Sequence, residues 1–205
     1  MRMHDGTGRQ AVPTNGSFER SGLSLVHAGV EAGAALHPPL AQRLHLASAE
    51  ITLPDRGRFR QHLEQRLQRG VGAPLGLFYV ELDAEGEPEA GFDRIVVLRL
   101  LHALRADDVV GRMGPGEFAC LLADVPGRYA LDHVAGRVRA ALEAPLESAR
   151  ESNGRGAAVH AHIGIAVCPR DGATAGVLLK HADEATFRAR AEGSGHAFFD
   201  PRLDP

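Results

Sequence analysis

The sequence predicts an α+β fold in which helices pack on a single mixed, mostly antiparallel sheet. The chain has 205 residues, 44% of them hydrophobic, which is enough for one domain with a sizeable core. From residue 53 onward, helical and strand patterns follow in the order α-β-α-β-β-α-β-α-β. Two of the strands, residues 109–113 and 117–122, are separated only by Gly114-Pro115-Gly116, and such a direct hairpin excludes a purely parallel sheet.

The N-terminal part of the chain has a different character from the rest. Residues 1–22 are rich in Gly, Ser, Thr and Asn and have no apolar period, which predicts a disordered N-terminus. Residues 23–50 are rich in Ala and Leu and are interrupted by Pro38 and Pro39, so we expect a helical extension made of two short helices. The main domain is expected to span residues 51–205.

The first elements of the main domain have clear boundary signals. Asp55 is a favourable N-cap, and apolar residues recur at every fourth position from Phe59 to Leu67, which predicts an amphipathic helix that ends at the next glycine. Residues 77–83 form a mostly apolar strand that ends in carboxylates. An acidic loop rich in Gly and Pro follows, and then a strongly apolar helix over residues 92–106.

After the hairpin, the same kinds of signal predict the last four elements. Residues 129–142 place their apolar side chains on one helical face. A polar loop over residues 146–156 leads to a strand at 159–168. Residues 175–191 form the last predicted helix, and 197–199 form a short edge strand.

Charge and cysteine content narrow the range of partners. The 23 basic and 26 acidic residues give a net charge of −3, which argues against a nucleic acid or an anionic membrane as a partner. Cys120 and Cys168 lie in apolar runs and are expected to be free thiols in a reducing compartment. No apolar run approaches the ~18 residues of a spanning helix, and Asp5, Glu19 and Glu31 do not suit a signal peptide. We therefore expect a cytoplasmic protein with no membrane insertion.

Several segments of the main domain match one set of motifs in order. These segments are Leu53-Pro54-Asp55-Arg56, Phe78 to Asp83, Arg112-Met113-Gly114-Pro115-Gly116-Glu117-Phe118, Ile163-Gly164-Ile165-Ala166 and Ala182-Asp183-Glu184-Ala185. Together they resemble the GGDEF-domain diguanylate cyclases, whose hairpin motif is Arg-x-Gly-Gly-Asp/Glu-Glu-Phe. The resemblance covers about residues 50–200 and implies the palm-like nucleotidyl-cyclase fold of that family, in agreement with the order of elements.

The resemblance also implies which groups a cyclase would need. Cyclases of this family join two GTP molecules into cyclic di-GMP, and each domain holds one GTP with two divalent metals through convergent oxygen ligands. The ligand positions correspond to Glu81, the backbone carbonyl of Leu82 and Gly116, which has no side-chain ligand. Pro115 replaces a motif glycine, and proline offers the nucleotide no N–H.

Other parts of the corresponding active site are altered as well. The family's guanine-reading Asn and Asp are missing after the first strand, Arg190 replaces a phosphate-binding lysine, and Ser194 replaces an arginine. We therefore expect a degenerate domain that is not an enzyme, with a vestigial active site at Glu81, Asp83, Gly114, Pro115, Gly116, Glu117 and Arg190.

Some residues of this vestigial site are expected to keep a role. Glu117 and Phe118 are interpreted as structural residues that hold the hairpin, with Phe118 in the core. Glu81 with Asp83 retains at most a weak site for one Mg²⁺, and neither a metal nor another cofactor is required.

The motif of a second site of this family, the inhibitory site, is present in this chain. Many members bind their product at an inhibitory Arg-x-x-Asp motif before the hairpin, and Arg105 to Asp108 match it in sequence and in distance from Gly114. Arg137 stands where the family often adds a second arginine. Arginine forks and carboxylates suit the phosphates and guanine edges of cyclic di-GMP. The alternative is that Arg105 and Asp108 form only a surface ion pair at a helix end.

These observations predict a receptor of cyclic di-GMP that uses Arg105, Asp108 and Arg137. Arg105 and Asp108 are both expected at the surface. Its output would be a change in binding to an unknown protein partner or a ligand-promoted homodimer. One alternative is an interaction scaffold that binds no nucleotide. Another is a GTP-binding regulator or a residual cyclase whose substrate site works without the missing groups.

Overall fold

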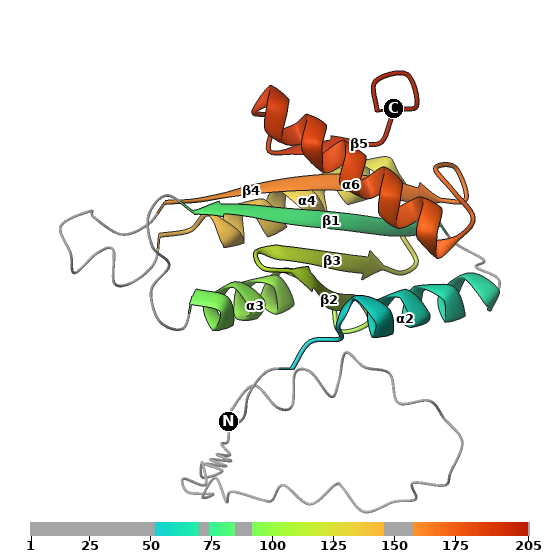
Figure 1. The fold of residues 1–205 in the computed structure, drawn as a ribbon, viewed down its shortest axis with the longest axis horizontal. Coiled ribbons are helices and arrows are strands. Elements are labelled where there is room, and N and C mark those ends of the chain that lie inside the picture. The colour runs from blue at the N-terminus through green and yellow to red at the C-terminus, as the bar shows by residue number, and fades with distance from the viewer. Residues whose placement is uncertain (1–51, 70–73, 85–91, 146–157, 205) are drawn as a thin grey trace, which may run out of the picture. The chain divides into compact units, whose positions relative to one another are not determined.

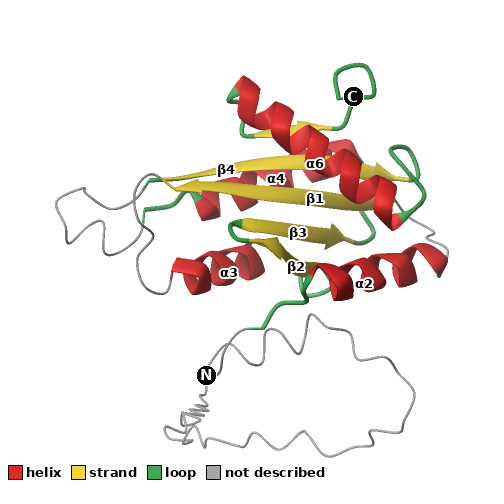
Figure 2. Ribbon diagram, viewed as in Figure 1, coloured by secondary structure: helices red, strands yellow, loops and turns green. Residues whose placement is uncertain are grey.

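The computed structural model describes residues 52–69, 74–84, 92–145 and 158–204. The predicted disordered segment 1–22 and helical extension 23–50 lie outside these residues and remain predictions. Within the described residues, five strands form a single mixed sheet, with helices on both of its faces (Figures 1 and 2). None of the helices described here has the length and apolar character that crossing a bilayer requires.

The elements follow the predicted order closely. The helices are α2 (Arg56–Gln68), α3 (Phe92–Ala103), α4 (Arg128–Leu142) and α6 (Ala175–Glu192). The strands are β1 (Leu75–Ala84), β2 (Val109–Gly114), β3 (Glu117–Leu122), β4 (Val159–Cys168) and β5 (His196–Phe198). Their order across the sheet is β2-β3-β1-β4-β5, and only the β4–β5 pair is parallel. The prediction of a mixed, mostly antiparallel α+β sheet is confirmed.

Two helix boundaries show how local chemistry decides where an element begins or ends. Asp55 caps α2 as predicted, because its Oδ1 accepts a hydrogen bond from the Arg58 N–H at 2.8 Å. Helix α3, which was predicted over residues 92–106, ends at Ala103. The next residues turn into β2 because the Asp108 carboxylate accepts the Arg105 N–H.

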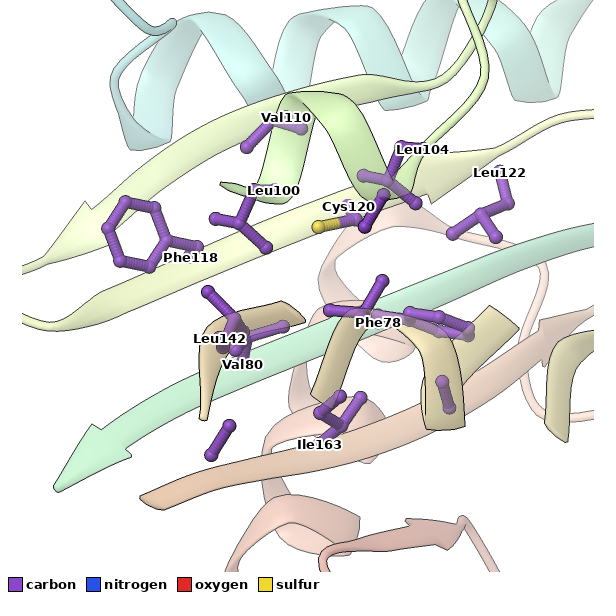
Figure 3. Close-up of a cluster of buried hydrophobic side chains, with 14 of the residues drawn as sticks. Phe78, Val80, Leu100, Leu104, Val110, Phe118, Cys120, Leu122, Leu142 and Ile163 are labelled. Atoms are coloured by element: carbon purple, nitrogen blue, oxygen red, sulfur yellow. The ribbon is translucent and has the colours of Figure 1, made fainter. Parts of the chain in front are cut away.

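The central strand β1 separates two hydrophobic cores. Successive side chains of a strand point to opposite faces, so Phe78 and Val80 pack under α3 and α4, whereas Leu77 and Tyr79 pack under α2 and α6. Figure 3 shows the first of these cores, in which Phe118 of the hairpin is fully buried. The predicted structural position of Phe118 is therefore confirmed.

The close packing of α6 on β4 depends on Gly164. A Cβ atom at this position would lie 1.8 Å from the carbonyl oxygen of Ala182 and 2.4 Å from the backbone nitrogen of Thr186. The Thr186 hydroxyl lies within hydrogen-bond distance of the Tyr79 carbonyl oxygen, at 3.1 Å, and therefore ties α6 to β1 as well. Only glycine allows the backbones of α6 and β4 to approach this closely.

Gly164→Ala is expected to destabilise the domain by about 3 kcal/mol or more, since the new methyl group meets helix backbone that has no room to move. Gly136→Ala is the matched control, because nothing lies within 4 Å of the added Cβ on α4. It should raise stability by up to about 1 kcal/mol, the difference between Gly and Ala in a helix. Urea unfolding of both variants tests this, and equal midpoints for the two would contradict the packing described.

Candidate functional site

The predicted vestigial site forms a polar cluster on the α6 face of the sheet. Glu81 and Asp83 are two positions apart on β1 and therefore share a face. The strand register places Glu117 of β3 directly opposite Glu81 on one side and His162 of β4 opposite it on the other. The sheet thus brings together carboxylates that are far apart in the sequence, just beyond the end of the apolar core under α6.

Arg190 of α6 binds both β1 carboxylates. Its Nη1 lies 2.8 Å from Glu81 Oε1, and its Nη2 makes a hydrogen bond to Asp83 Oδ1. The hydrogen bond to Asp83, followed by the charges of Glu81 and Asp83, raises the pKa of the Arg190 guanidinium. The second oxygen of Asp83 lies 3.2 Å from His162 Nε2. Both Asp83 oxygens and one Glu81 oxygen therefore have partners within the protein.

Glu117 has a hydrogen-bond partner on the neighbouring strand β1. Its Oε2 accepts a hydrogen bond of 2.8 Å from the Tyr79 hydroxyl. Burial, and then this bond and the Glu117 charge, raises the pKa of Tyr79. A Cβ atom at position 114 would lie 2.9 Å from Glu117 Oε2, so Gly114 leaves room for the carboxylate to turn toward Tyr79.

Negative charge accumulates around this cluster. Asp183 of α6 is an exposed residue near Glu117 and Glu81. Partial desolvation of its carboxyl, followed by the charges of these two residues, raises its pKa. Arg56 acts in the opposite direction on Asp183. The cluster therefore combines four carboxylates with few cations, and Arg190 is the one that touches two of the carboxylates.

The hairpin turn brings the backbone of Gly116, but no side-chain oxygen, to the position that the resemblance assigns to the metals. Gly116 lies at φ +70°, and its carbonyl oxygen accepts the Leu82 N–H at 3.0 Å. A Cβ at position 116 would lie 3.4 Å from the Leu82 carbonyl oxygen, so the turn is next to the backbone oxygen that the resemblance assigns to the metals. It brings no side-chain ligand there. Among the described residues, no three His, Cys, Asp or Glu side chains gather so as to hold a metal ion.

The second predicted site lies at the end of α3, on the other face of the sheet. Arg105 is exposed, as expected. Asp108 was expected at the surface, but it is only 5% exposed, and this expectation is wrong. Its Oδ2 accepts the Arg105 N–H at 2.7 Å, so the side chain closes the turn between α3 and β2. Burial raises the pKa of the Asp108 carboxyl, and hydrogen bonds from the N–H groups of Arg105 and Ala123 partly offset this.

Arg137 of α4 reaches the same turn. Its Nε donates a hydrogen bond of 2.8 Å to the carbonyl oxygen of Ala103, two residues before Arg105 in the chain. Arg137 is exposed, and this bond anchors it at the end of α3, the end that Arg105 follows in the chain. Arg139 donates instead to the Ser194 carbonyl oxygen at 3.2 Å.

Other features were missed by the sequence analysis. The bridge from Arg190 to Glu81 and Asp83 was not predicted, although the alternation of β1 side chains places both acids on one face. A cavity of about 410 Å³ beside β5 is lined by Arg128, Arg188 and His196, among others. Ser194, the altered active-site position named above, also lines it, but no sequence signal indicated a cavity there.

Comparisons with known proteins agree with this architecture. Residues 94–196 match the model of the family described as "Diguanylate cyclase, GGDEF domain". The chain is 30% identical over 176 residues to the diguanylate cyclase TpbB of Pseudomonas aeruginosa, covering 81% of this chain and 40% of the relative. It is 32% identical over 152 residues to the cyclic di-GMP phosphodiesterase NbdA of the same species, covering 70% of this chain and 18% of the relative. The chain thus spans well under half of these proteins.

The solved structures lead to the same assignment. The crystal structure of the GGDEF domain of TpbB superposes with a TM-score of 0.61 at 26% identity, over 73% of this chain and 98% of that one. The palm-like cyclase fold is therefore the fold of this protein. On the family model, the relatives and the shared fold, the chain belongs to the GGDEF-domain family of cyclic di-GMP signalling proteins.

Proposed function

We propose that this protein is a cyclic di-GMP receptor that has lost diguanylate cyclase activity. The observation that carries the proposal is that Arg137 is anchored at the end of α3, the helix end that Arg105 follows in the chain. Both arginines are exposed. The arrangement offers two planar forks to one ligand that has two phosphates and two guanines.

The vestigial site supports the loss of catalysis. Family membership alone does not decide activity, because the matched relatives include a protein named a cyclase and one named a phosphodiesterase. A cyclase needs oxygen ligands that converge on two metals, and Gly116 supplies none. Arg190 is engaged with Glu81 and Asp83, which are the acids that would remain for a metal.

Asp108 has a different role in this proposal from the one the motif implies. Its carboxylate is buried and bonded to backbone, so we assign it to positioning the Arg105 turn. Arg105 and Arg137 then contact the ligand, with guanine O6 and N7 or phosphate oxygens as acceptors. Asp108 as a direct contact to guanine stays a prediction from the sequence.

The output of the receptor would be a change in its association with other proteins. A ligand with two equivalent halves can bridge two copies of the site, so we propose a ligand-promoted homodimer or an altered surface for a protein partner. Both cysteines are free thiols, in keeping with a reducing cytoplasm. Calorimetry with cyclic di-GMP and with GTP separates the receptor from a scaffold that binds neither and from a regulator that binds GTP.

The purified protein should make no detectable cyclic di-GMP from GTP with Mg²⁺ or Mn²⁺, because the hairpin lacks a ligand at Gly116. Chromatography of the reaction mixture measures this directly. Product formation that disappears in Glu81→Ala would overturn the assignment as an inactive domain, since it would reveal a working site at β1. A trace that persists in this variant indicates a contaminating enzyme, and the assignment then stands.

Cyclic di-GMP should bind with a dissociation constant near or below ~10 µM, which corresponds to about −7 kcal/mol. Arg105→Ala and Arg137→Ala should each weaken binding at least about thirtyfold, since losing one charged hydrogen-bond partner costs ~2–4 kcal/mol. Titration calorimetry tests both variants. Arg94→Ala is the control, because Arg94 is an exposed arginine in the first turn of α3, at the end of this helix that is far from Arg105. Wild-type protein that gives no heat at about 100 µM ligand, well above this dissociation constant, would refute the proposal.

Asp108→Ala should lower the free energy of unfolding by about 1–3 kcal/mol, because the backbone N–H groups of Arg105 and Ala123 lose their acceptor. Asp107→Ala, at the exposed neighbouring position, should change it by less than about 0.5 kcal/mol. Urea unfolding measures both. If Asp108→Ala is as stable as wild type but loses the ligand, Asp108 contacts the ligand directly, as the motif predicts, and the positioning role is wrong.

A further inference from the structure

We infer that the Arg190 guanidinium serves as a built-in counter-ion in the place that a divalent cation would take between Glu81 and Asp83. The domain would therefore fold and keep its α6 face intact without any metal. Removing this guanidinium would leave a latent site for a divalent cation. The inference concerns the α6 face and does not depend on a ligand at Arg105.

The geometry of the bridge supports this role. Glu81 and Asp83 are two residues apart on one strand face, a separation of about 7 Å between their Cα atoms. Arg190 reaches both through different nitrogens, so one delocalised charge faces two carboxylates at once. A lysine ammonium is a compact point charge without this planar fork. The arginine therefore suits a position between two acids better than a lysine does.

The surroundings show why a counter-ion is needed. Glu117 is directly opposite Glu81 in the strand register, and Asp183 is close enough for Glu117 and Glu81 to raise its pKa. His162 contacts the remaining oxygen of Asp83. Without Arg190, the α6 face would hold several like charges at close range, a situation that is unfavourable unless a cation from solution binds there.

The bridge from Arg190 to Glu81 and Asp83 also disfavours the binding of anions at Arg190. The resemblance assigns position 190 to a group that holds a nucleotide phosphate. In this chain a phosphate would have to compete with two carboxylates that already accept hydrogen bonds from the guanidinium. The bridge thus disfavours a triphosphate and a metal at the same time, and one residue closes the old substrate site to both.

Arg190→Gln tests the inference, with Mn²⁺ as the probe and the free Mn²⁺ signal in electron paramagnetic resonance as the measurement. The wild-type chain should bind Mn²⁺ at least about tenfold more weakly than the variant, and the variant should gain one saturable site with a millimolar dissociation constant. Adding Glu81→Gln to Arg190→Gln should abolish that site. Arg60→Gln, which breaks an exposed ion pair between Arg60 and Glu64 on α2, is the matched control and should gain no Mn²⁺ site.

Thermal unfolding of the wild type gives a test that needs no variant. Its melting temperature should be the same, within about 1 °C, in 10 mM MgCl₂ and in KCl of equal ionic strength. Stabilisation specific to Mg²⁺ that is lost in Glu81→Gln would overturn the inference, and so would an Arg190→Gln variant that binds no more Mn²⁺ than wild type. Arg105 and Arg137 lie on the other face of the sheet. If the inference about Arg190 fails, the proposal that the protein binds cyclic di-GMP therefore still stands. A loss of cyclic di-GMP binding would likewise leave this inference intact.

Discussion

The approach of α6 to β4 at Gly164 determines the chemistry of the α6 face. The helix backbone passes so close to the strand that no side chain fits between them, and Thr186 adds a hydrogen bond to the backbone of β1. This contact fixes the height and direction of α6 over the sheet. Arg190 follows one turn after Thr186 and therefore reaches the end of β1, where Glu81 and Asp83 leave the apolar core. The close packing at Gly164 thus positions Arg190 to contact Glu81 and Asp83.

The sheet also keeps the two predicted sites apart. The carboxylate cluster faces α6, whereas Arg105 and Arg137 lie with α3 and α4 on the opposite side. Strand β2 connects the two sites along the chain, because it starts just after Asp108 and ends at Gly114. A ligand at the α3 end can therefore bind without any change in the charge balance beside α6. In the proposed function, this separation allows substrate chemistry to be lost while product binding is kept.

The sequence predicted the fold well because the relevant signals are local. Short apolar runs located the strands, and Asp55 and the Gly114-Pro115-Gly116 turn marked boundaries that the structure confirms. The sites were harder to predict because their geometry depends on distant contacts. Asp108 was expected at the surface, yet its carboxylate is buried, since it accepts hydrogen bonds from the Arg105 N–H of the turn after α3 and from the distant Ala123 N–H. The bridge from Arg190 to two acids more than 100 positions earlier depends on the packing of α6, which no local pattern reveals.

The hairpin shows which motif positions still have a structural partner. Gly114 gives Glu117 room to turn, Glu117 accepts the buried Tyr79 hydroxyl, and Phe118 fills the core. Each of these residues would be costly to replace, whether or not a nucleotide ever binds. Pro115 and Gly116 form the tip of the turn, where this chain departs from the family motif, and Pro115 is exposed. A side chain at position 116 would begin beside the Leu82 carbonyl oxygen. The hairpin therefore keeps the residues that folding requires, and its changes are confined to the tip of the turn, which agrees with the proposed loss of catalysis.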